Sequence, residues 1–277
     1  MNDAVLPYLR CPNCSSPIAA VPAGAGTGGL RCARGHSFDI ARHGYATLLA
    51  GRRPHVGDSP EMIADRATFL TAGHFWFIAS ALAEAATAVY RTGLVVDAGT
   101  GTGYYLAAVL DALPGAAGLG LDVAKPALRR AARAHPRASA ALADLWRPLP
   151  LADRSAGLIL DVFAPRNGPE FRRVLRPDGA LLVVTPAADH LAELVGAYDL
   201  IGVDPDKARR VGDSVGARFA VESTRTLRHE MRLDAAEIRT LIGMTPSARH
   251  VSPATLPAAH RTVTAAVDLT IYRSMHG

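Results

Sequence analysis

The stretch "LVVDAGTGTGYYLAAVLDAL" (residues 94–113) decides the fold of this chain. Its first five residues predict a buried strand over 94–98, and the glycines that follow predict a tight turn. The residues from 104 onward have the apolar pattern of a helix. A strand, a glycine-rich turn and a helix in succession are typical of parallel sheets that bind a ligand at the carboxyl ends of their strands.

The same alternation continues along the chain. The second and third strands are expected to end at Asp122 and Asp144, and the fourth is "GLILDVFAP" (157–165). The fifth strand is expected over residues 180–185, directly after a Pro-Asp-Gly turn. Two last strands, expected in 219–233 and 261–274, flank a helix. Alternating strands and helices predict an α/β fold with a mostly parallel sheet covered on both faces.

The glycine-rich turn predicts the ligand. Gly99, Gly101 and Gly103 form G-x-G-x-G, which is shorter than the dinucleotide fingerprint G-x-G-x-x-G of a nicotinamide enzyme. Asp97, just before the turn, would repel a pyrophosphate but could hold the ammonium group of S-adenosylmethionine. Asp122 is placed to accept hydrogen bonds from the ribose hydroxyls. Asp144 could accept a hydrogen bond from the adenine amino group. These residues favour S-adenosylmethionine over a nicotinamide cofactor.

All three cysteines lie in the first 32 residues. Cys11, Cys14 and Cys32 are joined by His36 in the spacing C-x2-C, then C-x3-H. Two such knuckles can converge into a tetrahedron around Zn²⁺, and four protein ligands make the site closed and structural. The intervening residues 15–30 predict a small hairpin with a glycine-rich tip, which metal binding would stabilise. The alternative is three unrelated thiols and a surface histidine.

Composition limits the class of protein. The chain has 277 residues, of which 49% are hydrophobic and 20% charged, as in ordinary globular proteins. No apolar run approaches the roughly 18 residues of a membrane span, and the first residues lack a signal-peptide pattern, so we expect a cytoplasmic protein. A net charge of +5 suits an anionic partner. Residues 51–57 lack apolar periodicity, and we expect them to be mobile or ordered by a ligand.

The sequence as a whole resembles the bacterial 23S rRNA (guanine-N1)-methyltransferases, the RlmA/TlrB family. The resemblance covers almost the whole chain in family order and spacing. It rests on "CPNC", "CARGHSFDIARHGYATLL", "GDSPEMIADRATFLTAGHF", "DAGTGTGYY", "GLDVAKPALRRAARAHP", "FAP", "LRPDGALLVVTPAADHLAEL" and "MTP".

The resemblance implies three parts and an activity. Residues 1–43 would be a zinc-ribbon-like domain that recognises RNA, residues 44–93 a linker and helical join, and residues 94–277 a class I (Rossmann-like) methyltransferase domain with a seven-stranded sheet. The enzyme would methylate N1 of a guanine in a 23S rRNA hairpin loop at the peptide exit tunnel. One subgroup of the family confers resistance to tylosin-type macrolides. No membrane partner is expected, and a homodimer is an open alternative.

The resemblance also assigns site residues. It implies Cys11, Cys14, Cys32 and His36 as zinc ligands, and Phe75, Gly101, Thr102 and His190 as cofactor contacts. Phe75 stands where the family often has tyrosine, so only ring packing is expected there. The full cofactor set is then Phe75, Asp97, Gly99, Gly101, Thr102, Gly103, Asp122, Asp144 and His190. No residue is assigned as the base that accepts the N1 proton, and the expected walls of the base pocket are Phe163, Ala164, Pro165, and Tyr104 or Tyr105.

Basic residues supply candidate RNA contacts. They are Arg10, Arg31, Arg34 and Arg42 near the zinc ligands, and Arg52, Arg53 and His55 in the join. Such side chains can bind phosphates, although scattered arginines are also common on solvated surfaces. Two other functions stay open: a small-molecule methyltransferase with the zinc domain as a lid, and a non-catalytic protein that binds S-adenosylmethionine or RNA. The basic zinc domain argues against the first, and the intact glycine turn with Asp97 and Asp122 argues against the second.

Overall fold

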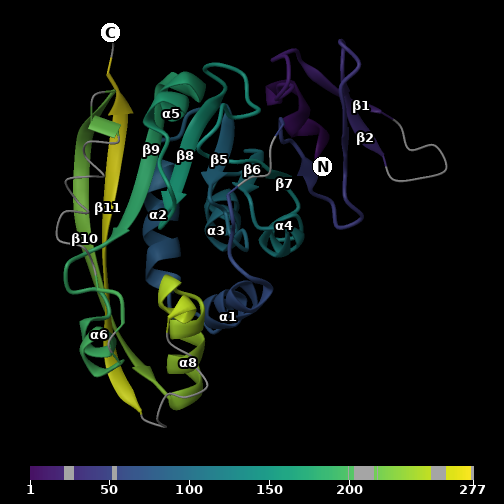
Figure 1. Cartoon of the computed structure of the whole chain (residues 1–277). Coiled ribbons are helices and arrows are strands. Elements are labelled where there is room, and N and C mark those ends of the chain that lie inside the picture. Colours follow the sequence, from purple (N-terminus) through teal and green to yellow (C-terminus); the bar gives the residue numbers. More distant parts are fainter. Residues whose placement is uncertain are drawn as a thin grey trace.

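The computed structural model describes residues 1–21, 28–51, 55–198, 200–202, 215–216, 218–250 and 260–275. In these ranges the chain forms a three-stranded sheet near the N-terminus and one large mixed sheet. Figure 1 shows the N-terminal part beside β6 and β7, and the hairpin of β10 and β11 at the opposite end of the large sheet.

The large sheet has the strand order β10-β11-β9-β8-β5-β6-β7-β4. Its strands are β4 (Ala46–Thr47), β5 (Leu94–Ala98), β6 (Gly118–Asp122), β7 (Ala138–Leu142), β8 (Ala156–Val162), β9 (Leu175–Pro186), β10 (Phe219–Leu233) and β11 (Arg261–Ser274). The pairs from β4 to β9 are parallel, whereas β11 is antiparallel to both β9 and β10. Without β4, and counted from β5, the order is 3-2-1-4-5-7-6, which is that of class I methyltransferases. The predicted α/β fold class is confirmed.

Three details differ from the expectation. The sheet has an eighth strand, since β4 comes from the expected linker and pairs with the outer edge of β7. Covering an open edge in this way protects it from pairing with other chains. β7 ends at Leu142, so Asp144 lies in the loop two residues beyond the strand. The expected turn at Pro177–Gly179 is part of β9, which already begins at Leu175.

The helices follow the sequence pattern. They are α1 (Pro60–Thr71), α2 (Trp76–Val89), α3 (Tyr104–Ala112), α4 (Lys125–Ala131), α5 (Gly168–Val174), α6 (Ala192–Tyr198) and α8 (Ala235–Gly243), with 3-10 turns at η1 (Asp3–Tyr8) and η2 (Pro246–Arg249). Ser59 caps α1 by accepting from the Met62 N–H, and Pro60 occupies a first-turn position that needs no N–H donor. Asp234 and Glu237 form a capping box on α8.

A short bend at Gly73 and His74 separates α1 from α2. Gly73 has φ 87°, and the two helices meet at a bend of 78°. Within the part of the chain that the structure describes, no single helix is long and apolar enough to cross a membrane; only this bent pair, taken together, reaches that length and composition.

The N-terminal module (residues 1–43) shares its core with the large sheet. It contains β1 (Ile18–Val21), β2 (Gly29–Cys32) and β3 (Ser37–Asp39), paired in the order β1-β2-β3. The hairpin of β1 and β2 is as predicted, and its expected glycine-rich tip, residues 22–27, lies outside the described residues. Val5 and Leu9 are buried in one cluster with Val96 and Leu121 of the sheet. The opposite face of the sheet packs against α2, α3 and α8. The module therefore covers one face of the sheet rather than standing apart from it.

Candidate functional site

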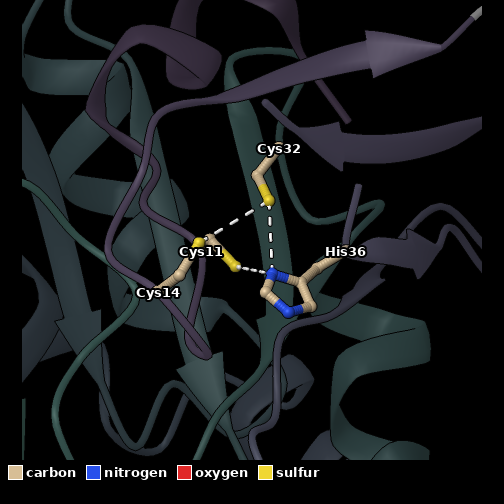
Figure 2. A group of neighbouring side chains, drawn as sticks. All are labelled: Cys11, Cys14, Cys32 and His36. Carbon is tan, nitrogen blue, oxygen red and sulfur yellow. Dashed lines mark hydrogen bonds between the residues drawn. The ribbon is translucent and has the colours of Figure 1, made fainter. Parts of the chain in front are cut away.

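Two turns bring the three cysteines and His36 together. In the first turn, the N–H of Ser15 donates to the carbonyl of Cys11 at 2.8 Å, and in the second the N–H of Gly35 donates to the carbonyl of Cys32 at 2.9 Å. Gly35 has φ 85°, a conformation that favours glycine. All four ligand atoms lie within 4.8 Å of one another, and the side chains point toward a common centre (Figure 2).

The spacing of these atoms fits a tetrahedral zinc ion. With Zn–S near 2.3 Å and Zn–N near 2.0 Å, the edges of the tetrahedron are about 3.8 Å between two sulfurs and about 3.5 Å between sulfur and nitrogen. The structure has 3.7 Å between the Sγ atoms of Cys14 and Cys32. Nδ1 of His36 lies 3.5 Å from Sγ of Cys11 and 3.4 Å from Sγ of Cys32. The donor set and its dimensions suit a closed structural zinc site held through Nδ1.

The glycine turn lies at the carboxyl end of β5. Gly99, Gly101 and Gly103 all have positive φ, at 78°, 53° and 81°. Two of these positions also exclude a side chain, because a Cβ on Gly99 would lie 2.5 Å from Cβ of Ala164 and one on Gly103 would lie 2.9 Å from Cα of Ala131. The turn is thus packed between the end of β8 and α4, with Thr102 half-buried at its tip.

Asp97 is almost completely buried beneath this turn, at 2% exposure. Its Oδ2 accepts a hydrogen bond of 2.6 Å from the hydroxyl of Thr100. Burial raises the pKa of Asp97 to about 7; the Thr100 hydroxyl opposes the rise and the nearby Asp122 adds to it. A buried carboxyl with one neutral partner is well suited to a cationic ligand group, which would stabilise its charged form.

Asp122 ties the turn to the end of β6. Its Oδ2 accepts from the N–H of Gly101 at 2.9 Å, and its Oδ1 accepts from the N–H of Ala124 at 2.8 Å. Burial raises the pKa of Asp122, while the two N–H donors lower it. A carboxylate oxygen can accept more than one hydrogen bond, so ribose hydroxyls could join these donors.

Asp144 is buried after β7 and already has partners. Its Oδ2 lies 3.0 Å from Nδ1 of His55 and 3.5 Å from Nε of Arg147, and its Oδ1 accepts from the N–H of Trp146. Burial raises the pKa of Asp144, but hydrogen bonds from His55 and from the Trp146 N–H hold it below its ordinary value. His55, expected as an RNA contact, therefore lies at the predicted adenine position.

Residues 55–58, which we call the strap, pass across the carboxyl ends of three strands. His55 contacts Asp144 after β7, and a Cβ on Gly57 would lie 3.0 Å from Cβ of Ala124 after β6. Asp58 forms an ion pair of 2.7 Å with Arg66, whose guanidinium lies over the glycine turn, since a Cβ on Gly101 would be 3.6 Å from its Nη1. Arg52 and Arg53, expected to bind RNA, lie outside the described residues.

Phe75 and His190 form a second group with Phe163. The ring of His190 lies 6.4 Å from that of Phe75 and 6.0 Å from that of Phe163. Nδ1 of His190 donates to the carbonyl of Ala266 at 2.8 Å, which fixes the ring against β11. Phe75 is buried and packs against Phe69 and Phe77, so ring packing is its observed role. Phe163 is 41% exposed and has φ 55° at the end of β8.

The structure therefore brings Asp97, the glycine turn and Asp122 into direct contact, with Asp144 beyond them and the Phe75–His190 pair at the β8 side. Two participants were not predicted. Thr100 lies inside the quoted turn and could have been found as a hydroxyl three residues after Asp97. Arg66 lies within a helix, and nothing in its sequence neighbourhood distinguishes it from other surface arginines.

Comparison with known proteins identifies the family of this chain. A family model described as "RlmA, N-terminal" matches residues 9–53. A protein of Streptomyces fradiae named 23S rRNA (guanine(748)-N(1))-methyltransferase is 44% identical, over 99% of this chain and 100% of the relative. This chain belongs to the 23S rRNA (guanine-N1)-methyltransferase family. Other members are one from Micromonospora griseorubida, 55% identical over 99% of both chains, and one from Bacillus subtilis, 30% identical over 87% of this chain and 86% of the relative.

Proposed function

We propose that this protein transfers a methyl group from S-adenosylmethionine to N1 of a guanine in a hairpin loop of 23S rRNA. The observation that carries the proposal is that one chain, similar to the relatives over its full length, joins a Cys₃His module to a group of contacts between Asp97, the glycine turn and Asp122, the proposed cofactor site. A role in macrolide resistance would follow if the methylated guanine lies at the drug site.

Each residue of the proposed cofactor site would have a distinct role. S-adenosylmethionine supplies a methyl group on a sulfonium, so the leaving group is activated already. Asp97 would hold the cationic methionine end, Asp122 the ribose hydroxyls and Asp144 the adenine amino group after His55 moves aside. Positioning of this kind can supply much of the rate acceleration for an in-line displacement. Guanine N1 must also lose its proton to an acceptor during the reaction.

Phe163 is proposed as the stacking surface for the guanine. N1 lies inside a Watson–Crick pair, so the target base must be unpaired or flipped out to react. The exposed ring of Phe163 lies at the end of β8, next to β5, where the order of the strands in the sheet reverses. An aromatic ring in this place is suited to stack on such a base. Its positive φ, uncommon for a bulky residue, places the ring outward at the cost of backbone strain.

The test compares methyl transfer from labelled S-adenosylmethionine to a 23S rRNA hairpin and to free guanosine, with primer extension locating the modified base. We expect transfer to the hairpin alone, and a stop at one guanine because N1 methylation blocks pairing. Equal turnover on guanosine would favour a small-molecule methyltransferase instead. Phe163→Ala should lower turnover on the hairpin, whereas Trp76→Ala, which removes another exposed aromatic ring (56% exposed), should not. Sedimentation with and without the hairpin tests the homodimer alternative.

A further inference from the structure

A group of cationic side chains lies where the N-terminal module meets α4. Arg42 and His43 belong to the turn just before β4, Arg129 lies in the last turn of α4, and Arg133 follows that helix. We call these four residues the arginine cluster. The two segments are in contact, since a Cβ on Gly44 would lie 3.7 Å from Cβ of Ala132.

His43 stands between two guanidinium groups. Its Nδ1 lies 3.1 Å from an Nη atom of Arg133, and its Nε2 lies 3.3 Å from Nε of Arg42. Guanidinium N–H groups can only donate, whereas a neutral imidazole has one accepting nitrogen and one N–H. One of the two ring nitrogens can accept from its guanidinium neighbour. The other presents its own N–H to a guanidinium donor, so this pair of donors has no acceptor between them.

Among the described residues, no carboxylate supplies that acceptor. Among the ion pairs of the described residues, none includes Arg42, Arg129 or Arg133, although all three are exposed and free to reach one. By contrast, Arg225 and Arg228 on β10 are paired with Glu84 and Asp189. Partial desolvation and the charges of Arg42, Arg129 and Arg133 lower the pKa of His43, which favours its neutral form. The three arginines of the cluster thus carry three positive charges without a counter-ion among the described residues.

We propose that the arginine cluster binds phosphates of the RNA backbone. The inference rests on the proposed function and says where the RNA lies outside the proposed cofactor site. Phosphate oxygens only accept hydrogen bonds, and the guanidinium fork matches them in a bidentate geometry. One phosphate between Arg42 and Arg133 would also accept from the N–H of His43, so that each of these donors has a partner.

The position of the cluster is consistent with a long RNA path. β4 pairs Ala46 with Ala141 and Thr47 with Leu142, so the turn before β4 lies level with the start of β7. The proposed cofactor site is at the other end of β7, about 16 Å away for a five-residue strand. A duplex carries one phosphate charge per about 1.7 Å of axis, so several phosphates separate the two places. RNA bound at both would contact the N-terminal module and the methyltransferase sheet together.

The inference is tested by titrating a 23S rRNA hairpin by filter binding at several KCl concentrations. The test variant is Arg129→Gln with Arg133→Gln, which removes two exposed charges and no packed side chain. We expect weaker binding and a slope of log K against log [KCl] that is shallower by about two units, near one for each lost phosphate contact. The matched control, Arg225→Gln with Arg228→Gln, should keep the wild-type slope. The charge-conserving variant, Arg129→Lys with Arg133→Lys, should retain most of the wild-type slope.

Cofactor affinity and zinc content, measured on every variant, show that the fold is intact. A wild-type slope in the Arg129→Gln, Arg133→Gln variant would overturn the inference while leaving methylation of the hairpin, and so the proposed function, in place. An equal loss of slope in the control variant would also overturn it, since the charge effect would then be diffuse. If the wild-type protein neither binds nor methylates the hairpin, the proposed function fails and the inference with it.

Discussion

The buried carboxyl of Asp97 should make the protein without cofactor less stable as the pH rises. The folded-state pKa, about 7, lies above the ordinary value of 3.8 because the group is buried. The stability that the protonated carboxyl contributes is therefore complete below pH 3.8 and is lost as the pH rises through about 7. At about 1.36 kcal/mol per pH unit, that interval corresponds to about 4 kcal/mol.

Asp97→Asn removes the ionisation but keeps an oxygen that can accept from Thr100. Between pH 5.5 and 7 the free energy of unfolding of the wild-type protein should fall by about 2 kcal/mol relative to that of the variant. This range covers about 1.5 of the pH units between the unfolded-state and folded-state pKa values. Above pH 7.5 the difference should stay constant. Thermal unfolding of both proteins at pH 5.5, 6.5, 7.5 and 8.5 measures this difference. As the pH is raised over this range, the Tm of the variant minus the Tm of the wild type should increase by about 4–8 °C.

The same substitution should weaken cofactor binding. Loss of a charged hydrogen-bond partner costs about 1.5–3 kcal/mol, so calorimetry should show a large drop in affinity for S-adenosylmethionine at pH 8. Wild-type affinity should rise as the pH increases through about 7, where Asp97 ionises, and the affinity of the variant should not. A difference in Tm that does not change with pH would refute the reasoning, since Asp97 would then ionise as easily in the folded chain as in the unfolded one.

Three further results are expected. Cys14→Ser should release one zinc per chain in metal analysis and lower Tm of the whole chain, because the N-terminal module shares its core with the sheet; native protein without zinc would contradict this. Asp122→Ala should weaken cofactor binding by about 1.5–3 kcal/mol, and Asp122→Asn by less, since the amide keeps one acceptor for the turn. His55→Ala should strengthen cofactor binding several-fold in calorimetry by leaving Asp144 open to the adenine; weaker binding would mean that His55 holds the cofactor instead.

The parts of the site that sequence could predict are those with local causes. The strand before Gly99, the tight glycine-rich turn that follows it and the two cysteine knuckles each depend on a few neighbouring residues, and each was predicted from the sequence. The contact of Asp97 with Thr100 is equally local. Asp144 was expected at the end of a strand, but Ala138–Leu142 stops two residues earlier.

What escaped prediction depends on the path of distant segments. Nothing in the local sequence says that His55 reaches Asp144, 89 residues away, or that Arg66 lies over Gly101. The pairing of Ala46 with Ala141 is similar: a two-residue strand has no periodicity to detect, and it forms only because the edge of β7 is open. The outward ring of Phe163 depends on a backbone conformation that residue type alone would argue against.

The common core has a consequence for synthesis on the ribosome. Val5, Leu9, Leu30 and Phe38 leave the exit tunnel early, but the buried cluster to which they belong also includes Ile159 of β8, a strand that ends at Val162. At 5–20 residues per second, the roughly 120 residues between the module and that point take about 6–24 s to make. During this interval the buried cluster around the nascent module is incomplete, and the hairpin of the module is too small to be stable alone. A metal ion bound to Cys11, Cys14, Cys32 and His36 would hold the nascent hairpin in shape until the sheet is complete.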